Sequence, residues 1–377
     1  MLAGLATVMV AVLIGMWFVR PDVGTHDPEA RPPEGSAACI PVGPLTSVDA
    51  INEFLSTAPG VQSFQGADVG VDVGLQDGRR LWLFGDTLRD GDGEREALVR
   101  NSMLVFSADC IEVVDAGGGA VIPDRQDGVG YWPMSVFRQP GSGLDTVFVM
   151  AQRVRTVAPG LFGFEVLGSS IAVFLVPWGE TPQLIGVRDL DADLVDPQRP
   201  VWGAAAAVDD GWVYLFGTSR RPMSGLHGFA LSVARVRPAH VLDTGRWRYW
   251  EGAEWVMNPG RAWALIDERG GVSQTLSVFE QEGEWFALSK RDDFLGNDLV
   301  VWTAPSPVGP FDDGTTVAPL PGGPNGELTY MALAHPELLP QPGTVVVSWS
   351  RNSGELDQIF ADPLLYRPRF GRVPLPE

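Results

Sequence analysis

The chain has 377 residues, and a composition of 45% hydrophobic and 20% charged residues excludes an intrinsically disordered protein. Its 27 Lys and Arg residues stand against 47 Asp and Glu, a formal net charge of −20 that argues against nucleic acid as a partner. The abundance of Gly (45), Pro (31) and Trp (13) favours many short strands joined by turns over a helical bundle.

The N-terminal part predicts the compartment. An apolar run of 18 residues, Leu2 to Val19, is typical of a secretory signal peptide or a short membrane anchor, and we assign this role to residues 1–20. Residues 21–45 follow as a linker that is at first rich in Pro, Asp, Glu and Gly. We therefore expect an exported protein, extracellular or anchored in the cell envelope, that contacts a membrane through its N-terminal segment alone.

The chain has two cysteines, Cys39 and Cys110. An exported protein meets an oxidising compartment, so we expect a disulfide between them that fixes the leader segment to the domain. Two unrelated thiols are the alternative. Neither cysteine belongs to a zinc-binding spacing, and the four histidines are scattered along the chain. The sequence therefore predicts no metal site and no cofactor.

One short helix is predicted over residues 47–57, where apolar residues recur at helical spacing and Thr46 or Ser47 can cap the first turn. Strand patterns follow. A short apolar strand that ends in a polar cluster occurs five times, with equivalent positions at Phe84, Met150, Phe216, Ala287 and Ser348. The spacings of 66, 66, 71 and 61 residues indicate one supersecondary unit copied around an axis.

Each of these units has room for four strands. Another apolar strand precedes the repeated one, as at residues 201–208, and polar turns such as residues 209–211 join the two. Five four-stranded units closed in a ring make an all-β, five-bladed β-propeller, which we predict over residues 46–377. A two-sheet sandwich is the alternative, against which five sequential copies argue.

A ligand site is predicted at one mouth of the central channel. In a propeller the first strand of each blade starts, and the second ends, at the same mouth, and polar side chains concentrate at these positions here. Cleavage of a glycosidic bond needs one protonated acid and one ionised partner, and the candidate catalytic residues are Asp68, Asp86 and Glu327. The candidate substrate-binding residues are Tyr131, Trp132, Gln152, Arg153, Trp202, Arg220, Gln274, Asp292, Tyr330 and Arg351.

Each candidate also has a purely structural interpretation. Asp68 and Asp86 can be turn residues, and Glu327 follows a Gly-rich stretch in which it can simply be solvated. Trp and Tyr side chains often serve blade packing, and Arg side chains of an acidic protein form salt bridges.

Two acidic segments are compatible with calcium. Residues 189–193 resemble the start of a calcium loop, but Leu194 replaces the required Gly and Pro200 stands where the bidentate Glu should be. Residues 89–94 form a second acidic loop. Calcium is therefore kept as an alternative to solvated loops.

Two motifs resemble a known family. Residues 81–87 (Leu-Trp-Leu-Phe-Gly-Asp-Thr) with Asp68 upstream, and residues 362–370 with their Tyr366-Arg367-Pro368 element, look like a bacterial family long catalogued as a domain of unknown function. Some of its members are classed as endo-D-arabinanases in glycoside hydrolase family 183. The resemblance covers about residues 60 to 372, and residues 303–311 are also similar to the blade-closing segments of other five-bladed glycosidases.

The resemblance implies a five-bladed propeller that is exported and cleaves α-linked D-arabinofuranose chains of cell walls. It also implies that Asp68 and Asp86 match the acidic positions of the family's first blade. Related propeller glycosidases draw further carboxylates from the second and third blades, where this chain has none near the strand starts. Asp292 or Glu165 are the candidates to substitute for them.

Three hypotheses follow. The first is an exported, endo-acting glycoside hydrolase with a polysaccharide substrate, in which Asp68 and Asp86 are the nucleophile or base and its partner, and Glu327 is the acid. The second is a non-catalytic envelope propeller that binds glycan or protein. The third is a sialidase-like site, prompted by Arg153 and by two further arginines, Arg220 and Arg351, although the repeated aspartate-box motifs are missing.

Overall fold

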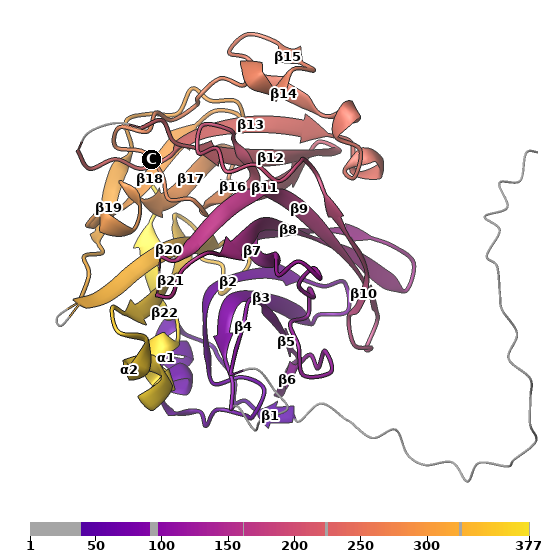
Figure 1. The fold of residues 1–377 in the computed structure, drawn as a ribbon, viewed down its shortest axis with the longest axis vertical. Helices are drawn as coiled ribbons and strands as arrows, with labels where there is room; N and C mark the ends of the chain where they lie inside the picture. Colours follow the sequence, from indigo (N-terminus) through magenta and orange to yellow (C-terminus); the bar gives the residue numbers. More distant parts are fainter. Residues whose placement is uncertain (1–38, 91–96, 161, 223–224, 324–325, 377) are drawn as a thin grey trace, which may run out of the picture. The chain divides into compact units, whose positions relative to one another are not determined.

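The structure is a computed structural model that describes residues 39–376, apart from 91–96, 161, 223–224 and 324–325. The predicted signal or anchor, and the linker up to residue 38, lie outside this part. Within it, no helix is long and apolar enough to span a bilayer. Five antiparallel sheets follow one another along the chain as the blades of a five-bladed β-propeller, which confirms the predicted fold (Figure 1).

Each sheet is built from consecutive strands, and the first long strand of each lies innermost. Blade one contains β1 (Cys39–Pro41), β2 (Gly66–Gly74), β3 (Arg80–Leu88), β4 (Leu98–Val99), β5 (Ser102–Phe106) and β6 (Cys110–Val113). Blade two contains β7 (Gly130–Pro140), β8 (Leu144–Thr156), β9 (Phe164–Pro177) and β10 (Gln183–Asp189). Blade three contains β11 (Val201–Asp209), β12 (Trp212–Ser219), β13 (Ala230–Val236), β14 (Arg248–Trp250) and β15 (Trp255–Val256). Blade four contains β16 (Ser277–Gln281), β17 (Glu284–Lys290), β18 (Asp298–Ala304) and β19 (Thr315–Pro319), and blade five contains β20 (Glu327–His335), β21 (Thr344–Ser353) and β22 (Arg369–Pro374).

The number of strands per blade differs from the four that the repeat predicts. Blades two and four have four strands, whereas blade one has six, blade three has five and blade five has three. In blade five, helix α1 (Val48–Thr57) covers the edge that a fourth strand would take. The Asn52 side chain pairs with Phe370 there as a strand would, donating to its carbonyl and accepting from its N–H, both at 2.9 Å. Because β1 joins the outer edge of blade one, the N-terminal segment links blades one and five where the ring closes.

Helices are short. Helix α1 forms where predicted, and the Ser47 side chain caps it by accepting from the Ala50 N–H. The other helical segments lie in connections: α2 (Leu356–Ala361), η1 (Pro238–His240), η2 (Thr244–Arg246), η3 (Pro259–Arg261), η4 (Asp293–Leu295) and η6 (Pro363–Tyr366).

The second strand of each blade forms much of the core. Leu81 and Leu83 of β3, like Val147 and Met150 of β8, have no exposed surface. Each blade of the closed ring has a neighbouring blade on both faces. The middle strands of a blade are therefore apolar on both sides, and their hydrophobic residues form continuous runs in the sequence. This packing explains why the five repeats are visible in the sequence.

Bulges shape the inner strands. The register between the first two strands shifts in blades one, two, three and five, each time close to the mouth where the inner strand starts. A bulge takes a residue out of the hydrogen-bonded ladder and re-aims its side chain. The inner strands therefore present side chains to the channel mouth that a regular strand would not.

Candidate active site

Asp68 and Asp86 lie in the same bulge of blade one. The pairing of β2 with β3 shifts between Ala67 and Val69, and both acids fall outside the paired positions. Val69 has a φ of +66°, a left-handed conformation that costs a β-branched residue about 1–3 kcal/mol. Its N–H donates to the Ser350 hydroxyl at 2.8 Å, which helps to hold this backbone in place. The strained bulge places both carboxyl groups at the mouth of the channel.

The Asp68 carboxyl group is surrounded by hydrogen-bond donors. Its Oδ2 accepts from the Tyr330 hydroxyl at 2.9 Å, and the Tyr366 hydroxyl and the Asp86 N–H also donate to this group. A Cβ on Gly85 would lie 2.4 Å from Asp68 Oδ1, so glycine is needed at that position. Burial raises the pKa of Asp68 to about 6, although the donors act in the opposite direction.

Asp86 is the second carboxyl group of the bulge. Its Oδ1 accepts from the indole N–H of Trp132 at 2.7 Å. Burial, and next the charge of Asp68, raise the pKa of Asp86 to about 7, while Arg100 lowers it and Asp124 raises it more weakly. Asp86 therefore keeps its proton close to neutral pH, which is what an acid catalyst needs.

The two acids line a cavity of about 450 Å³. Gln152 and Gln274, from blades two and four, meet there through a hydrogen bond of 2.8 Å between their side-chain amides. The Arg220 guanidinium enters from blade three and lies over the Phe229 ring at 4.4 Å. The sequence candidates that line the cavity are Asp68, Asp86, Trp132, Gln152, Arg220, Gln274 and Tyr330.

A further carboxyl group, which the sequence analysis did not single out, comes from blade four. Asp293 begins η4 and lines the cavity, whereas the neighbouring candidate Asp292 does not. Both residues have left-handed φ values, 59° for Asp292 and 62° for Asp293, and this tight reversal has no sequence signal such as Gly. Burial raises the pKa of Asp293 to about 6, and its Oδ2 lies 3.9 Å from the Arg220 Nη1.

Glu327 and Arg351 are not among the residues that line the cavity. The Glu327 Oε1 lies 3.6 Å from the Arg351 Nη1. Arg351 in turn donates to the Leu364 carbonyl at 2.8 Å, in the C-terminal segment. For Glu327 the physical reason is strand alternation: Leu328 and Tyr330 line the cavity in the regular part of the β20–β21 ladder, so the side chains of Glu327 and Thr329 fall on the other face.

Three other candidates are buried within the blades. Tyr131 and Trp202 are only 4% and 6% exposed and serve blade packing. Arg153 has no exposed side-chain surface and forms ion pairs with Asp191 at 2.7 Å and Asp193 at 2.8 Å. The alternative interpretations, packing for the aromatic residues and salt bridging for Arg153, therefore describe these side chains.

The acidic segment 189–193 surrounds arginine side chains where a calcium loop would surround a metal. Besides Arg153, Arg125 pairs with Asp189 at 3.0 Å and with Asp193 at 2.8 Å. In the part of the chain that the structure describes, no group of three or more His, Cys, Asp or Glu side chains is arranged to hold a metal ion. Residues 91–94 of the other acidic loop lie outside that part.

Aromatic residues at strand ends and in connections supply further walls of the cavity. Phe164 packs edge-on against Trp132, with ring centroids 4.6 Å apart, and Phe162 stacks on Phe294 at 5.3 Å. Phe162 is 63% exposed although it is aromatic, as expected for a ring that meets a ligand. The sequence repeat gives no signal for these aromatic residues. Glu165, Asn352 and Tyr366 also belong to the lining.

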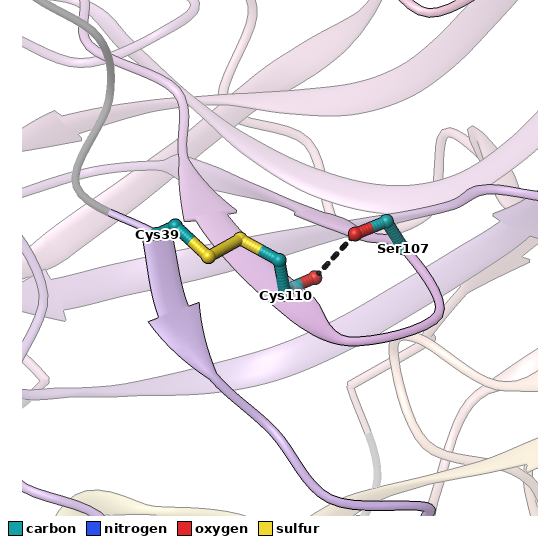
Figure 2. The surroundings of a disulfide bond; sticks show 3 residues. All are labelled: Cys39, Ser107 and Cys110. Atoms are coloured by element: carbon teal, nitrogen blue, oxygen red, sulfur yellow. Dashed lines mark hydrogen bonds between the residues drawn. A yellow bond between two sulfur atoms is a disulfide. The ribbon is translucent and has the colours of Figure 1, made fainter.

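A disulfide joins Cys39 to Cys110, the pairing that the sequence analysis expects. Figure 2 shows that it connects the edge strand β1 to β6, and that Ser107 donates to the Cys110 carbonyl in the adjoining turn, at 3.0 Å. The first described residues are thereby fastened to the outer edge of blade one.

A family model described as domain of unknown function (DUF5005) matches residues 52–374. No curated protein matches the sequence. A solved structure from Bacteroides ovatus, whose assignment as a hydrolase is provisional, is similar with a TM-score of 0.63 and 17% identity, covering 85% of this chain and 88% of its own. The α-L-arabinofuranosidase of Podospora anserina, solved with cellotriose, is similar with a TM-score of 0.50 and 11% identity, covering 90% of this chain and 97% of its own. At such sequence identities, the likeness of both structures shows the fold.

Proposed function

This chain belongs to the family described as domain of unknown function (DUF5005), and we propose that it is a glycoside hydrolase whose catalytic residues are Asp68 and Asp86. The observation that carries the proposal is the pairing of these two carboxyl groups in one bulge at a cavity. Their pKa values are raised to about 6 and about 7, respectively, so near neutral pH one is ionised while the other holds a proton. Glycosidic cleavage requires this combination.

The roles follow from the surroundings of each acid. Asp86, with the higher pKa, donates its proton to the leaving oxygen as the bond to the anomeric carbon breaks. Asp68 acts as the carboxylate that attacks the anomeric carbon, or that takes a proton from an attacking water. Glu327 is not among the residues that line the cavity, and the proposal gives it no role in this step.

The charge of the cavity supports a neutral glycan as substrate. Besides the acid pair, Glu165, Asp196 and Asp293 line it, against Arg199 and Arg220. An anionic sugar would be repelled by this excess of carboxylates. The sialidase-like alternative also fails because Arg153 is buried among aspartates and Arg351 faces Glu327.

We further propose endo-acting cleavage of α-D-arabinofuranosyl linkages in cell-wall arabinan. The support is the resemblance of the Gly85-Asp86-Thr87 and Tyr366-Arg367-Pro368 elements to endo-D-arabinanases, since both elements contribute to the surroundings of Asp68. The Podospora anserina α-L-arabinofuranosidase adds an example of a similar fold that acts on arabinofuranosides. Export is part of the proposal, and a disulfide at the start of the described chain is consistent with it.

The test is the release of oligosaccharides from purified D-arabinan by the full chain. Asp86→Asn should lower kcat/KM by about 10²–10⁴-fold, the usual contribution of an acid catalyst, with an unchanged melting profile at low pH. The matched control is Asp210→Asn, in the exposed turn between β11 and β12, where Asn tolerates the left-handed φ of 44°. Binding of arabinan without any released product would instead support a non-catalytic glycan-binding propeller.

A further inference from the structure

The Tyr366-Arg367-Pro368 motif lies against the strand that carries Asp68. A Cβ on Gly66, the first residue of β2, would lie 2.7 Å from the Pro363 carbonyl oxygen and 2.9 Å from that of Tyr366. The backbones of η6 and β2 therefore approach each other as closely as glycine permits. The C-terminal segment is thus packed onto the start of the first blade.

Arg367 fixes this approach. Its Nε donates to the Gln65 carbonyl at 2.9 Å, and its Nη1 donates to the carbonyls of Leu55 and Ala58, both at 2.8 Å. Leu55 and Ala58 belong to the C-terminal end of α1, whose last carbonyls need donors from outside the helix. One guanidinium therefore ties together the helix, the approach to β2 and the segment that carries Tyr366.

Two phenols consequently reach Asp68 from different elements. Tyr366 comes from η6, and Tyr330 comes from β20 with its hydroxyl 2.9 Å from Asp68 Oδ2. Asn352 Nδ2 donates to the Tyr330 oxygen at 3.4 Å. Because a phenol has one proton and the Tyr330 oxygen accepts from Asn352, that proton is directed to Asp68. In the described part of the chain, the side-chain donor to Asp86 is the Trp132 indole, and no phenol donates to it.

We propose that Tyr330 and Tyr366 are positioning residues that give the two acids different roles: by donating to Asp68 and not to Asp86, they make Asp68 the carboxylate and leave the proton on Asp86. The inference rests on the proposed function and deepens it. A carboxyl group that accepts several hydrogen bonds is stabilised in its ionised form, whereas burial alone would favour the neutral form of both acids.

The chemistry depends on this order of ionisation. When the glycosidic C–O bond breaks, its electron pair stays on the leaving oxygen, which takes the proton of Asp86. The Asp68 carboxylate, or a water that gives it a proton, forms the new bond to the anomeric carbon. If the proton lay on Asp68 instead, the leaving oxygen would find no donor at Asp86 and the anomeric carbon no base at Asp68.

The charged groups near the pair stay in place when a phenol is removed. Asp68 is faced by Asp86 from β3 and by the two tyrosines, and the charges next to Asp86 are those of Arg100 and Asp124. A Tyr→Phe change removes one hydroxyl and keeps the ring, so a change in the ionisation of Asp68 can be assigned to the lost donor.

The experiment compares Tyr330→Phe, Tyr366→Phe and the double variant of the full chain by ¹³C NMR titration of the aspartate carboxyl groups. The Asp68 signal is assigned from Asp68→Asn. We expect the acid dissociation constant of Asp68 to fall about tenfold in each single variant and about a hundredfold in the double variant. In turnover, the acidic limb of the pH profile of kcat/KM should move to higher pH, by about one pH unit in each single variant and about two in the double variant.

The matched control is Tyr249→Phe, a buried tyrosine that packs against Trp202 outside the cavity. It should leave the titration of Asp68 and the pH profile unchanged. Normally folded Tyr330→Phe and Tyr366→Phe variants with an unaltered Asp68 titration would overturn the inference. The NMR readout needs no turnover, so a protein that does not cleave arabinan refutes the proposed function separately from the order of ionisation.

Discussion

The Asp68 carboxyl group lies against the backbone of Gly85, at a place where a Cβ would be only 2.4 Å from Asp68 Oδ1. The next residue, Asp86, donates its N–H to the same carboxyl group. The close contact is therefore what lets two acids from neighbouring strands share one bulge. It also makes Gly85 a residue of functional importance without any side chain of its own.

Gly85→Ala should inactivate the site by displacing Asp68. A shift of about 1 Å in a reacting group can cost about 100-fold in rate, and we expect a fall in kcat/KM of at least about that size. The free energy of unfolding should fall by about 1–3 kcal/mol because a buried carboxyl group has to move. Gly186→Ala is the control, since a Cβ there meets nothing within 4 Å. Retention of full activity in Gly85→Ala would contradict the assigned role of Asp68.

The pH dependence of cleavage should be bell-shaped. Asp68 must be ionised, and its pKa of about 6 sets the acidic limb, below which activity falls as the group takes up a proton. Asp86 must be protonated, and its pKa of about 7 sets the alkaline limb, above which activity falls as the proton is lost. Initial rates at low substrate concentration from about pH 4 to about pH 9 test this. Activity that keeps rising above about pH 8 would exclude Asp86 as the acid.

Asp86→Asn should stabilise the protein at alkaline pH while it lowers turnover. The pKa of Asp86 is raised from 3.8 to about 7, so between these values the folded state binds more protons than the unfolded state. Stability therefore falls as the pH rises through this window, and the whole penalty is present above about pH 7. Asn removes it, which should add up to about 4 kcal/mol to the free energy of unfolding at about pH 8 and nothing below about pH 4. Urea unfolding at the two pH values measures the difference, and equal effects at both would refute the assignment.

A second polar network, at the other end of the inner strands, should matter for stability and not for turnover. His335 Nδ1 lies 2.5 Å from Asp72 Oδ1, and its Nε2 lies 2.7 Å from the Ser348 hydroxyl. The order Ser–His–Asp is that of serine hydrolases, but Ser348 has no exposed surface and cannot meet a substrate. The network joins blade one to blade five at the seam where the ring closes.

His335→Ala leaves the Ser348 hydroxyl without a partner and opens a space next to Trp82. We expect a loss of about 2–4 kcal/mol in the free energy of unfolding, measured by urea denaturation at neutral pH. The kcat/KM of the folded variant should stay within about twofold of the unchanged protein, because the cavity lies at the opposite mouth. A selective loss of turnover would show instead that the network acts on the active site.

The sequence was sufficient for the architecture. The strand repeats at Phe84, Met150, Phe216, Ala287 and Ser348 lie in β3, β8, β12, β17 and β21, the second strand of each blade. Because these strands pack against neighbours on both faces, their apolar runs are continuous and their number can be counted. The strands at the ring closure were not predictable in the same way, since a helix and an N-terminal strand complete blades five and one there.

The candidate site, like the fold, was predictable from the sequence only in part. The sequence indicated Asp68 and Asp86 because Asp68 stands at the start of the first strand of blade one and Asp86 at the end of the second, two positions that meet at the same mouth of a propeller. It could not separate Asp293 from Asp292, because a left-handed turn decides which of the two side chains lines the cavity. It named Tyr330 as a candidate substrate-binding residue, but it could not show that this phenol donates to Asp68. The Tyr330 hydroxyl meets that carboxyl group across 262 positions of sequence, and only the closed ring brings the first and last blades together.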